Sequence, residues 1–356
     1  MTRRLLWARL ADQRPGRELA WLAGMPGTHV TEVGSPRTQD DVDWVPGRFR
    51  RPVQRFVEAG ALAWQRDLAA VRPDYDWVAS LELCALVTGQ AHRYARRHGL
   101  RQAVLTWENM PDQPLYRIPP YRGATRRALR ADLFVCFLEA ARDHLRVLGV
   151  EDERIAVVAP PVDLARFTPA PAPAERPVLV FASPVAPNKG IDRVLDAFDR
   201  VRAVRPDAEL RVLGSGPLVP LVKAAEERTG GAVRHLGHGG PEFVARELRE
   251  AAVFVSAPRP TWKWNEQYGL AYLEAMASGL PVVTTRCGTN HEAVPPPNAL
   301  VPDDADALAD ALLDILGDTT RRHALGRANR AHVEARHDPA RQYAALGAAF
   351  ARAELR

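Results

Sequence analysis

Residues 264–283 have the sequence WNEQYGLAYLEAMASGLPVV, which indicates a loop, an apolar helix and the start of a strand. The helix begins near Gly269, and Glu274 is the single charged residue between Tyr268 and Val283. Because its neighbours are Leu, Ala, Met and Tyr, we expect the Glu274 carboxylate to be largely buried against a sheet. An ionised carboxylate buried in this way costs several kcal/mol unless a partner compensates it. The stretch therefore predicts a helix that packs on a sheet and carries a carboxylate in need of a partner.

The same stretch offers groups that suit three chemical parts of one ligand. A pair of vicinal hydroxyls, as on a ribose, is one suitable partner for Glu274. The unpaired N–H groups and the positive dipole end of a helix that begins near Gly269 favour a phosphate. Glu266, in the loop before the helix, suits the hydroxyls of a sugar. A structural role for Glu274, bonded to a backbone N–H or to an Arg, is the alternative at this point.

Short β-branched segments alternate with helical ones on both sides of this stretch. In the C-terminal half, the predicted strands are 178–182, 210–213, 233–236, 253–256 and 282–285, and the predicted helices are 191–204, 218–228 and 241–251. In the N-terminal half, the predicted strands are 77–81, 104–107, 133–137 and 155–158, and the predicted helices are near 51–71, 84–98 and 139–148. This alternation is typical of βαβ units with parallel sheets.

A proline-rich segment, Thr168-Pro-Ala-Pro-Ala-Pro-Ala174, separates the two halves and suits a stiff, extended linker. We therefore expect an α/β fold of two Rossmann-like domains that face each other across a cleft. The expected boundaries are 1–168 for the N-terminal domain, 169–175 for the linker, 176–337 for the C-terminal domain and 338–356 for a final helix.

Lysine is rare in this chain: of the 48 Lys and Arg residues, three are Lys, at positions 189, 223 and 263. Where Arg is so strongly preferred, a Lys indicates a need for a compact charge that fits one phosphate oxygen. Lys189 follows the predicted strand 178–182 and precedes Gly190, at a corner of the sheet where ligands usually bind. A solvated loop lysine is the alternative. We interpret Lys223 as a solvated helix lysine and leave Lys263 open.

The composition is that of an ordinary globular protein, with 46% hydrophobic and 26% charged residues. No apolar run approaches the roughly 20 residues that span a membrane. Arg9, Asp12 and Arg14 interrupt the apolar stretch that a signal peptide would need. Three widely separated cysteines indicate neither a disulfide framework nor a zinc site. The expected location is the cytoplasm.

The net charge of +5 lies in the N-terminal half, because residues 1–170 carry 25 Arg and 20 acidic residues and the remainder is balanced. Part of this excess lies in five arginines interleaved with tyrosines and prolines: Arg117, Arg122, Arg126, Arg127 and Arg130. A face for anionic lipid or a charged acceptor is one interpretation, and an Arg-rich solvated helix is the other. No DNA- or RNA-binding motif is present, so nucleic acid is not an expected partner.

A series of motifs carries a resemblance to a known family. The motifs are Asn188-Lys-Gly-Ile-Asp192, Leu213-Gly-Ser-Gly-Pro217, His235-Leu-Gly237, the pair Glu266 and Glu274, and Glu-Ala-Met-Ala-Ser-Gly-Leu-Pro-Val-Val at 274–283. In this order they resemble the donor domain of the GT-B retaining glycosyltransferases of family 4, the group 1 glycosyl transferases. Weaker similarities to the family extend to the stretch before the linker: Gly149-Val150, Ile155–Asp163 and Phe167–Pro169.

The resemblance implies an enzyme that moves a sugar from a nucleoside diphosphate sugar to an acceptor with retention of configuration. In such an enzyme Lys189 would hold the donor diphosphate, Glu274 the ribose hydroxyls and Glu266 the transferred sugar. The further donor-binding positions that the resemblance implies are Tyr268, Gly269, Leu270, Gly216 and His238. The backbone at Gly269 and Leu270 would face the phosphates, and the loop around His238 would pass near the base.

The resemblance also implies partners and location. No cofactor and no metal is expected, because the helix end and basic side chains stabilise the departing diphosphate. The N-terminal domain would bind the acceptor, which could be a glycan, a lipid-linked sugar or a small molecule. Polysaccharide biosynthesis in the cytoplasm is the expected setting, at the inner face of the membrane if the basic N-terminal face binds lipid.

Two positions depart from the family pattern. Position 184, where the family has Arg, is Pro184, and Arg259 or Lys263 is a candidate substitute. The strand that commonly ends in a cleft-facing His ends here in Thr106-Trp107-Glu108-Asn109, so Glu108 would take the place of that His as a third catalytic candidate beside Lys189 and Glu266. Glu82, after the predicted strand 77–81, is a further candidate for the same cleft. A surface-loop Glu is the alternative for both residues, and for Glu82 it is the interpretation we favour. The glycine-rich turn after the first strand is also absent, with Leu10–Gly16 in its place.

Other classes fit less well or stay open. Gly214 and Gly216 match two of the three glycines of a dinucleotide-binding loop, but Val219 replaces the third, which disfavours an oxidoreductase. No phosphate loop of a P-loop NTPase is present. A non-catalytic relative that binds a nucleotide sugar or a partner enzyme stays open because of Pro184. An epimerase or hydrolase that acts on the nucleotide sugar alone also stays open.

Overall fold

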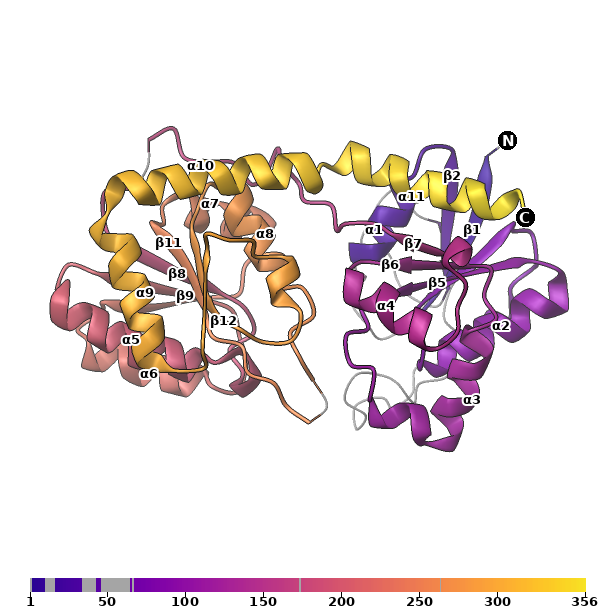
Figure 1. The fold of residues 1–356 in the computed structure, drawn as a ribbon, viewed down its shortest axis with the longest axis horizontal. Helices are drawn as coiled ribbons and strands as arrows, with labels where there is room; N and C mark the ends of the chain where they lie inside the picture. Colours follow the sequence, from indigo (N-terminus) through magenta and orange to yellow (C-terminus); the bar gives the residue numbers. More distant parts are fainter. Residues whose placement is uncertain are drawn as a thin grey trace. The chain divides into compact units, whose positions relative to one another are not determined.

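A computed structural model describes residues 2–9, 17–33, 43–45, 65, 67–172, 174–262 and 264–356 of the chain. Most of the predicted helix at 51–71, the turn at Leu10–Gly16 and Lys263 lie outside these residues. The chain divides into two compact units: unit 1 is Met1–Pro161 with Ala340–Arg356, and unit 2 is Val162–Pro339. Each unit contains a sheet with helices around it (Figure 1).

The described strands of unit 1 form one parallel sheet in the order β3-β2-β1-β4-β5-β6-β7. The strands are β1 Arg3–Ala8, β2 Thr28–Val33, β3 Asp43–Val45, β4 Trp77–Leu81, β5 Arg101–Thr106, β6 Leu133–Cys136 and β7 Ile155–Val157. The helices are α1 Arg17–Ala23, α2 Leu86–His98, α3 Pro119–Ala128, α4 Glu139–Val147 and α11 Pro339–Glu354, with 3-10 turns η3 Asp67–Ala70, η4 Pro114–Arg117 and η5 Asp152–Arg154. The central strands are apolar and buried along their length, as is usual when helices cover both faces of a parallel sheet.

The described strands of unit 2 form a second parallel sheet in the order β10-β9-β8-β11-β12-β13. The strands are β8 Val178–Ala182, β9 Glu209–Leu213, β10 Val233–Gly237, β11 Val253–Ser256, β12 Val282–Thr285 and β13 Ala299–Val301. The helices are α5 Ile191–Val204, α6 Val219–Arg228, α7 Pro241–Arg249, α8 Leu270–Ala277, α9 Ala305–Gly317 and α10 Thr319–Arg336, with 3-10 turns η6 Pro187–Lys189 and η7 Asn290–Glu292. A core of buried aliphatic and aromatic side chains, among them Phe181, Phe198 and Leu312, joins α5, α6 and α9 to one face of the sheet.

The two sheets share the same strand order, except that unit 1 has the additional strand β7 at one end. In both, the strand order reverses beside the first strand, between β1 and β4 and between β8 and β11. In open parallel sheets, ligands bind outside the carboxyl ends of the strands at such a reversal. The α/β fold of two Rossmann-like domains is therefore confirmed, and the topology indicates where in each unit a ligand would bind.

The boundary between the units differs from the expected one at residue 168. The N–H of Val162 donates a hydrogen bond to the carbonyl oxygen of His337 at 3.0 Å, and Nη1 of Arg330 donates to that of Phe167 at 2.6 Å. These contacts place residues 162–168 in unit 2. The proline-rich segment also packs on unit 2, since Nη2 of Arg322 bonds the carbonyl oxygen of Ala174 at 3.2 Å.

The final helix α11 belongs to unit 1. The ring of Phe350 packs edge-on against that of Trp77, with the ring centroids 4.9 Å apart. The carboxylate of Glu354 accepts hydrogen bonds from the side chains of Arg3 and Trp77 at 2.7 and 2.9 Å. The expected division treated the last helix as a separate element. The structure instead places it in the core of unit 1.

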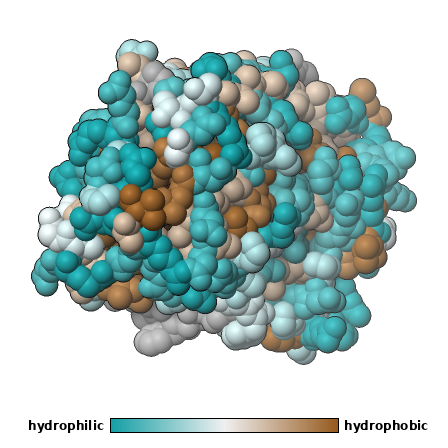
Figure 2. Space-filling view, turned by 60° about the vertical axis from the view of Figure 1, so that its left-hand side comes forward, coloured by the Kyte–Doolittle hydropathy of each residue, from teal (hydrophilic) through white to brown (hydrophobic). Residues whose placement is uncertain are grey.

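The face in view in Figure 2 carries hydrophobic side chains in small patches among hydrophilic ones, which is ordinary for a protein surface. Within the described residues, no helix combines the length and the apolar character that crossing a membrane requires.

Candidate functional site

The carboxyl ends of the unit 2 strands bring the predicted donor-binding residues to one edge of the sheet. Lys189 follows β8, Gly216 follows β9, His238 follows β10, and Glu266 follows β11. Because β8 and β11 are neighbours at the reversal of strand order, the loops of Lys189 and Glu266 meet there.

Lys189 and Glu266 form an ion pair, with 2.7 Å between Nζ and Oε2. The ammonium of Lys189 also lies 4.3 Å from the ring centroid of Trp264, within the range of a cation–π contact. The Lys189 and Glu266 side chains are 19% and 10% exposed. The pair therefore places one cation and one carboxylate together, partly shielded from water. Because water screens charges less at such a place, each group interacts more strongly there with a charged or polar ligand.

Gly190 fixes the turn that carries Lys189. Its φ is +66°, a left-handed conformation that residues with a Cβ rarely adopt. A Cβ at this position would lie 1.7 Å from the carbonyl oxygen of Ala257, the first residue after β11. The absence of a side chain thus lets the loop after β8 lie against the end of β11.

Helix α8 provides the second part of the site. Gly269 is its N-cap and Leu270 its first residue, so the N–H groups of its first turn point toward the same edge of the sheet. Glu274 is 7% exposed and lies one turn after Leu270, on the same face of the helix. Burial, together with the nearby Glu266 carboxylate, raises the pKa of Tyr272 on α8, which places Glu266 beside this helix. Tyr268, just before the helix, is buried, and its hydroxyl bonds the carbonyl oxygen of Glu292 at 3.4 Å.

The loops after β8, β9 and β10 are bonded to one another. The N–H of Gly214 donates to the carbonyl oxygen of Gly237 at 2.8 Å. A Cβ on Gly216 would lie 2.4 Å from the carbonyl oxygen of Val185, so only glycine allows the turn after β9 to pack this closely on the loop after β8. His238 is exposed beside these turns.

Arg259 lies beside the turn that carries Lys189. A residue that replaces the missing Arg at position 184 would have to lie there. Its guanidinium bonds both carboxylate oxygens of Asp192 at 2.6 and 2.8 Å and the carbonyl oxygen of Pro187 at 3.0 Å. Its backbone N–H donates to the carbonyl oxygen of Asn188 at 3.0 Å. Arg259 therefore brings a cation to the loop that precedes α5, where it is paired with Asp192.

Glu82 and Glu108 in unit 1 lie at the carboxyl ends of the adjacent strands β4 and β5. The Glu82 carboxylate accepts hydrogen bonds from Thr106 Oγ1 at 2.9 Å and from the N–H of Trp107 at 3.1 Å. Thr106 Oγ1 in turn accepts one from the N–H of Glu108 at 3.1 Å. Glu82 is thus half-buried and bonded to the turn that carries Glu108, which argues against the surface-loop interpretation favoured from the sequence.

Glu82 also has a φ of +66°, which is unusual for a residue other than glycine. This conformation costs on the order of 1–3 kcal/mol and persists where surrounding contacts enforce it, often at functional sites. The hydrogen bonds to Thr106 and Trp107 are contacts of this kind.

Glu108 is 8% exposed and accepts hydrogen bonds from the Tyr116 hydroxyl at 2.6 Å and from the N–H of Met110 at 2.7 Å. Burial raises the pKa of Glu108, and the hydrogen bond from Tyr116 opposes that rise. The ring of Tyr116 stacks on that of His144, 5.6 Å between centroids. Sequence reasoning did not single out Tyr116 or His144, because their pairing depends on the packing of η4 against α4.

The raised pKa of Glu82 leads us to expect that the stability of the protein depends on pH. Burial, and next the charge of Glu108, raise the pKa of Glu82 from its usual 4.5 to about 8. The folded chain then holds this proton more tightly than the unfolded chain, so stability falls as pH rises from about 4.5 to 8. We expect Glu82→Gln, which cannot titrate, to lose less stability than the wild type between pH 5 and pH 9. Chemical denaturation at several pH values measures this, and parallel curves for the two proteins would contradict it.

Comparisons with known proteins agree with this geometry. The model of the family "Glycosyl transferases group 1" matches residues 176–318. A GDP-mannose-dependent monoacylated alpha-(1-6)-phosphatidylinositol monomannoside mannosyltransferase of Corynebacterium glutamicum is 35% identical over 191 residues, 49% of this chain and 50% of the relative. The chain therefore spans about half the length of this relative. A D-inositol 3-phosphate glycosyltransferase of Kineococcus radiotolerans is 32% identical over 347 residues, 88% of this chain and 72% of the relative.

Solved structures support the fold. The crystal structure of Anabaena HepE in complex with UDP has a TM-score of 0.77 and 16% identity, and the match covers 99% of this chain and 100% of that one. Sucrose-phosphate synthase from Thermosynechococcus elongatus has a TM-score of 0.75 and 16% identity, with 99% of both chains covered. These matches confirm the GT-B fold. Together with the family model and the relative from Kineococcus, they mean that the chain belongs to the group 1 family of glycosyl transferases.

Proposed function

We propose that the chain transfers a sugar from a nucleoside diphosphate sugar to a hydroxyl group of an acceptor. The observation that carries this proposal is the Lys189–Glu266 pair at the reversal of the unit 2 sheet, next to the first turn of α8. This arrangement combines a cation and free N–H groups for a diphosphate with a carboxylate for sugar hydroxyls.

The buried Glu274 extends this site toward the nucleoside. Its carboxylate suits the two hydroxyls of a ribose, and Leu270 on the same helix face presents its N–H to the phosphates. Gly216 and His238 lie in the loops that continue along the sheet edge, which suits contacts to the base. Tyr268 shapes the loop between Glu266 and α8.

In the proposed reaction, the bond between the anomeric carbon and the diphosphate oxygen breaks, and the acceptor oxygen bonds to that carbon. The acceptor hydroxyl gives its proton to the departing phosphate oxygen, from which it passes to water, and the released nucleoside diphosphate carries the additional negative charge. Lys189 and the first turn of α8 stabilise that charge, which is why we propose that no metal is needed. Attack and departure on the same face of the sugar would retain the configuration.

Glu108 is our candidate for contact with the transferred sugar or the acceptor, and Glu82 positions it through Thr106. The short hydrogen bond from Tyr116 fixes one Glu108 oxygen, and the N–H of Met110 fixes the other. A carboxyl held in this way is suited to accept a hydrogen bond from an acceptor hydroxyl in one orientation.

Two mannosyltransferase relatives support guanine as the base of the donor. The mannosyltransferases of Corynebacterium glutamicum and Mycolicibacterium smegmatis, 35% and 32% identical in the matched regions, are named as GDP-mannose-dependent. Anabaena HepE, with UDP bound, is 16% identical. We therefore propose a GDP-sugar as the donor and an inositol-containing lipid or glycan precursor as the acceptor class.

Calorimetric titration of GDP, UDP and ADP without added metal tests the donor site. We expect GDP to bind the wild type and Glu274→Ala to weaken that binding about 10- to 100-fold, because the ribose hydroxyls lose their acceptor. The matched control is Glu226→Ala, on α6 and paired with Lys223 away from the sheet edge. Tighter binding of UDP would overturn the choice of base. Failure of all three nucleotides to bind would overturn the donor site.

A non-catalytic relative is the second candidate, favoured by Pro184 in place of the family's Arg. It predicts the same nucleotide binding without release of GDP from GDP-mannose in the presence of inositol-containing acceptors. Product analysis separates these two candidates and also detects hydrolysis or epimerisation of the donor alone.

We further propose that the arginines of α2 and α3 contact an anionic membrane surface. These helices pack closely: a Cβ on Gly89 of α2 would lie 3.0 Å from Cα of Ala124 of α3. Neither helix contains an acidic residue. In the described part of the chain, no carboxylate pairs with Arg96, Arg97, Arg117, Arg122, Arg126, Arg127 or Arg130. Ile118, beside them, is 43% exposed.

Co-sedimentation with lipid vesicles tests this proposal. We expect the wild type to bind vesicles that contain about 30% anionic lipid and not neutral ones, with binding lost as salt rises. The double substitution Arg122→Glu/Arg126→Glu should abolish binding, whereas Arg142→Glu/Arg146→Glu on α4, where both arginines are already paired with acids, should retain it. Equal binding by both variants would contradict a role for α3.

A further inference from the structure

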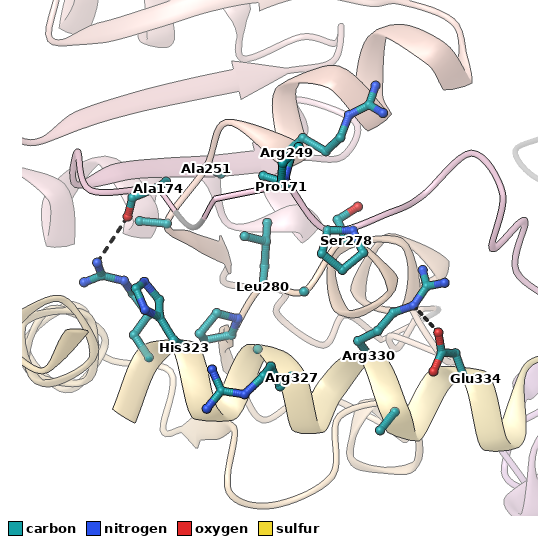
Figure 3. A pocket seen from close by; sticks show the side chains of 18 residues that line it. Pro171, Ala174, Arg249, Ala251, Ser278, Leu280, His323, Arg327, Arg330 and Glu334 are labelled. Atoms are coloured by element: carbon teal, nitrogen blue, oxygen red, sulfur yellow. Dashed lines mark hydrogen bonds and ion pairs between the residues drawn. The ribbon is translucent and has the colours of Figure 1, made fainter. Parts of the chain in front are cut away.

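A cavity of about 310 Å³ lies in unit 2, away from the loops of the donor site. Its walls include Ala251 and Ala252, just before β11, and Pro281, just before β12. These residues mark the amino-terminal edge of the sheet, whereas Lys189 and Glu266 follow the carboxyl ends of their strands. In Figure 3, Leu280 and Pro171 lie on one side of the cavity, and α10 passes along the other.

The cavity wall contains a buried cation without a carboxylate partner. Arg322 is 5% exposed, and its guanidinium bonds the carbonyl oxygens of Leu316 and Ala174, each at 3.2 Å. Among the described residues it makes no ion pair. Asp318, whose charge favours the Arg322 cation, caps α10 by accepting from the N–H of Arg321. Burial, and next the charge of Arg205, lower the pKa of Arg322. A buried charge with incomplete compensation is costly, and an anion beside it would remove that cost.

Further donors surround the same space. Nε2 of His323 is buried and has no hydrogen-bond partner in the described structure. Arg249 and Arg327 line the cavity and form no ion pair within the residues described. Arg330 is paired with Glu334 at 2.6 Å. The four arginines and the single acid leave a local excess of positive charge, which favours a ligand that carries more than one negative charge.

The rest of the wall is mostly apolar, and its Ser278 hydroxyl already donates to the carbonyl oxygen of Glu274. Leu280, Pro171, Pro281 and small alanines form it, so water in the cavity finds few partners there. The volume is at the small end of ligand-binding pockets. The occupant that fits both features is compact, with a charged end that faces the arginines and an apolar body that covers the alanines and prolines.

We propose that this cavity is a second ligand site that binds a small phosphate monoester with a compact apolar group. The dianionic phosphate pairs with Arg322 and Arg327 and accepts a hydrogen bond from His323. The apolar group lies against Leu280 and the proline-rich segment. A ligand there holds residues 169–172 to α10 and stabilises unit 2 by binding its folded form.

Calorimetric titration with phenyl phosphate tests the site. We use the full chain with Lys189→Ala, so that binding at the donor site does not contribute. We expect a Kd below about 1 mM, weaker binding of inorganic phosphate, and a loss of affinity of about tenfold or more in Arg327→Glu. The matched control is Arg321→Glu in the first turn of α10, which lies outside the cavity and where Arg321 pairs with Asp314.

His323→Leu is a second variant that places an apolar side chain of roughly similar size there and removes the hydrogen-bond donor. It should also weaken phenyl phosphate binding while leaving the thermal midpoint of the unliganded protein close to that of its parent. The proposal fails if 5 mM phenyl phosphate does not bind (roughly five times the expected Kd), or if Arg327→Glu and Arg321→Glu bind it equally. Nucleotide binding by the chain with Lys189 intact is measured separately, so failure here leaves the donor site untouched.

Discussion

Replacing Lys189 by alanine is expected to lower kcat/KM for sugar transfer by about 100- to 1000-fold, the range seen when a charge-stabilising donor is removed from an active site. Lys189 is the cation of the ion pair with Glu266, and its Nζ lies 4.3 Å from the ring centroid of Trp264. When the sugar–phosphate bond breaks, the diphosphate gains charge in a partly buried site, where one ammonium has a large effect. Release of GDP from the donor, measured by a coupled assay, gives the rate.

Two controls separate this effect from a loss of structure. Lys223→Ala removes an exposed lysine that is paired with Glu226, and it should leave both activity and stability unchanged. Lys189→Arg keeps the charge but places a planar, wider group beside Trp264, so we expect it to restore activity only in part. A Lys189→Ala protein that keeps its thermal midpoint and at least half of the wild-type kcat/KM would refute the proposed role.

Gly190→Ala is expected to have the largest effect on stability. The substitution combines a left-handed φ of +66° with a Cβ that would lie 1.7 Å from the carbonyl oxygen of Ala257. The conformation alone costs about 1–2 kcal/mol, and the clash with backbone adds about 1–3 kcal/mol or more. For a unit of this size, we expect the thermal midpoint to fall by about 10 °C.

The chain contains a matched control for this substitution. Gly99 also has a φ of +66°, but a Cβ there would meet nothing within 4 Å. Gly99→Ala should therefore lose the conformational part of the free energy of unfolding and not the part caused by the clash. Thermal and chemical denaturation of the two variants measure the difference, and equal losses would mean that the loop after β8 moves freely away from β11.

Much of unit 2 could be predicted from its sequence. The β-branched runs gave five of its strands within one residue of those observed, whereas β13 was not predicted. The signal is strong because β8, β11 and β12 are buried and rich in β-branched residues, which is a local property of the sequence. The prediction of unit 1 was less complete: β1, β2, β3 and α1 were not predicted, and α3 was expected only as an Arg-rich helix without bounds. Much of the chain around 34–64 lies outside the described residues. The strand β1 carries a recognisable signal in Leu5–Ala8, whereas β3 is only three residues long.

By itself, the sequence determined the alternation of strands and helices, the burial of Glu274 on an apolar helix and the position of Lys189 at a strand-to-helix corner. These follow from the spacing of apolar residues along one segment, which is a local property. The tertiary structure decided which side chains meet: Lys189 with Glu266, 77 positions apart, and Glu82 with Thr106. It also decided that the proline-rich segment packs on unit 2 and that Arg322 is buried at the far edge of the sheet. Such pairings depend on strand order and on the register between neighbouring strands, which are set by contacts between distant parts of the chain.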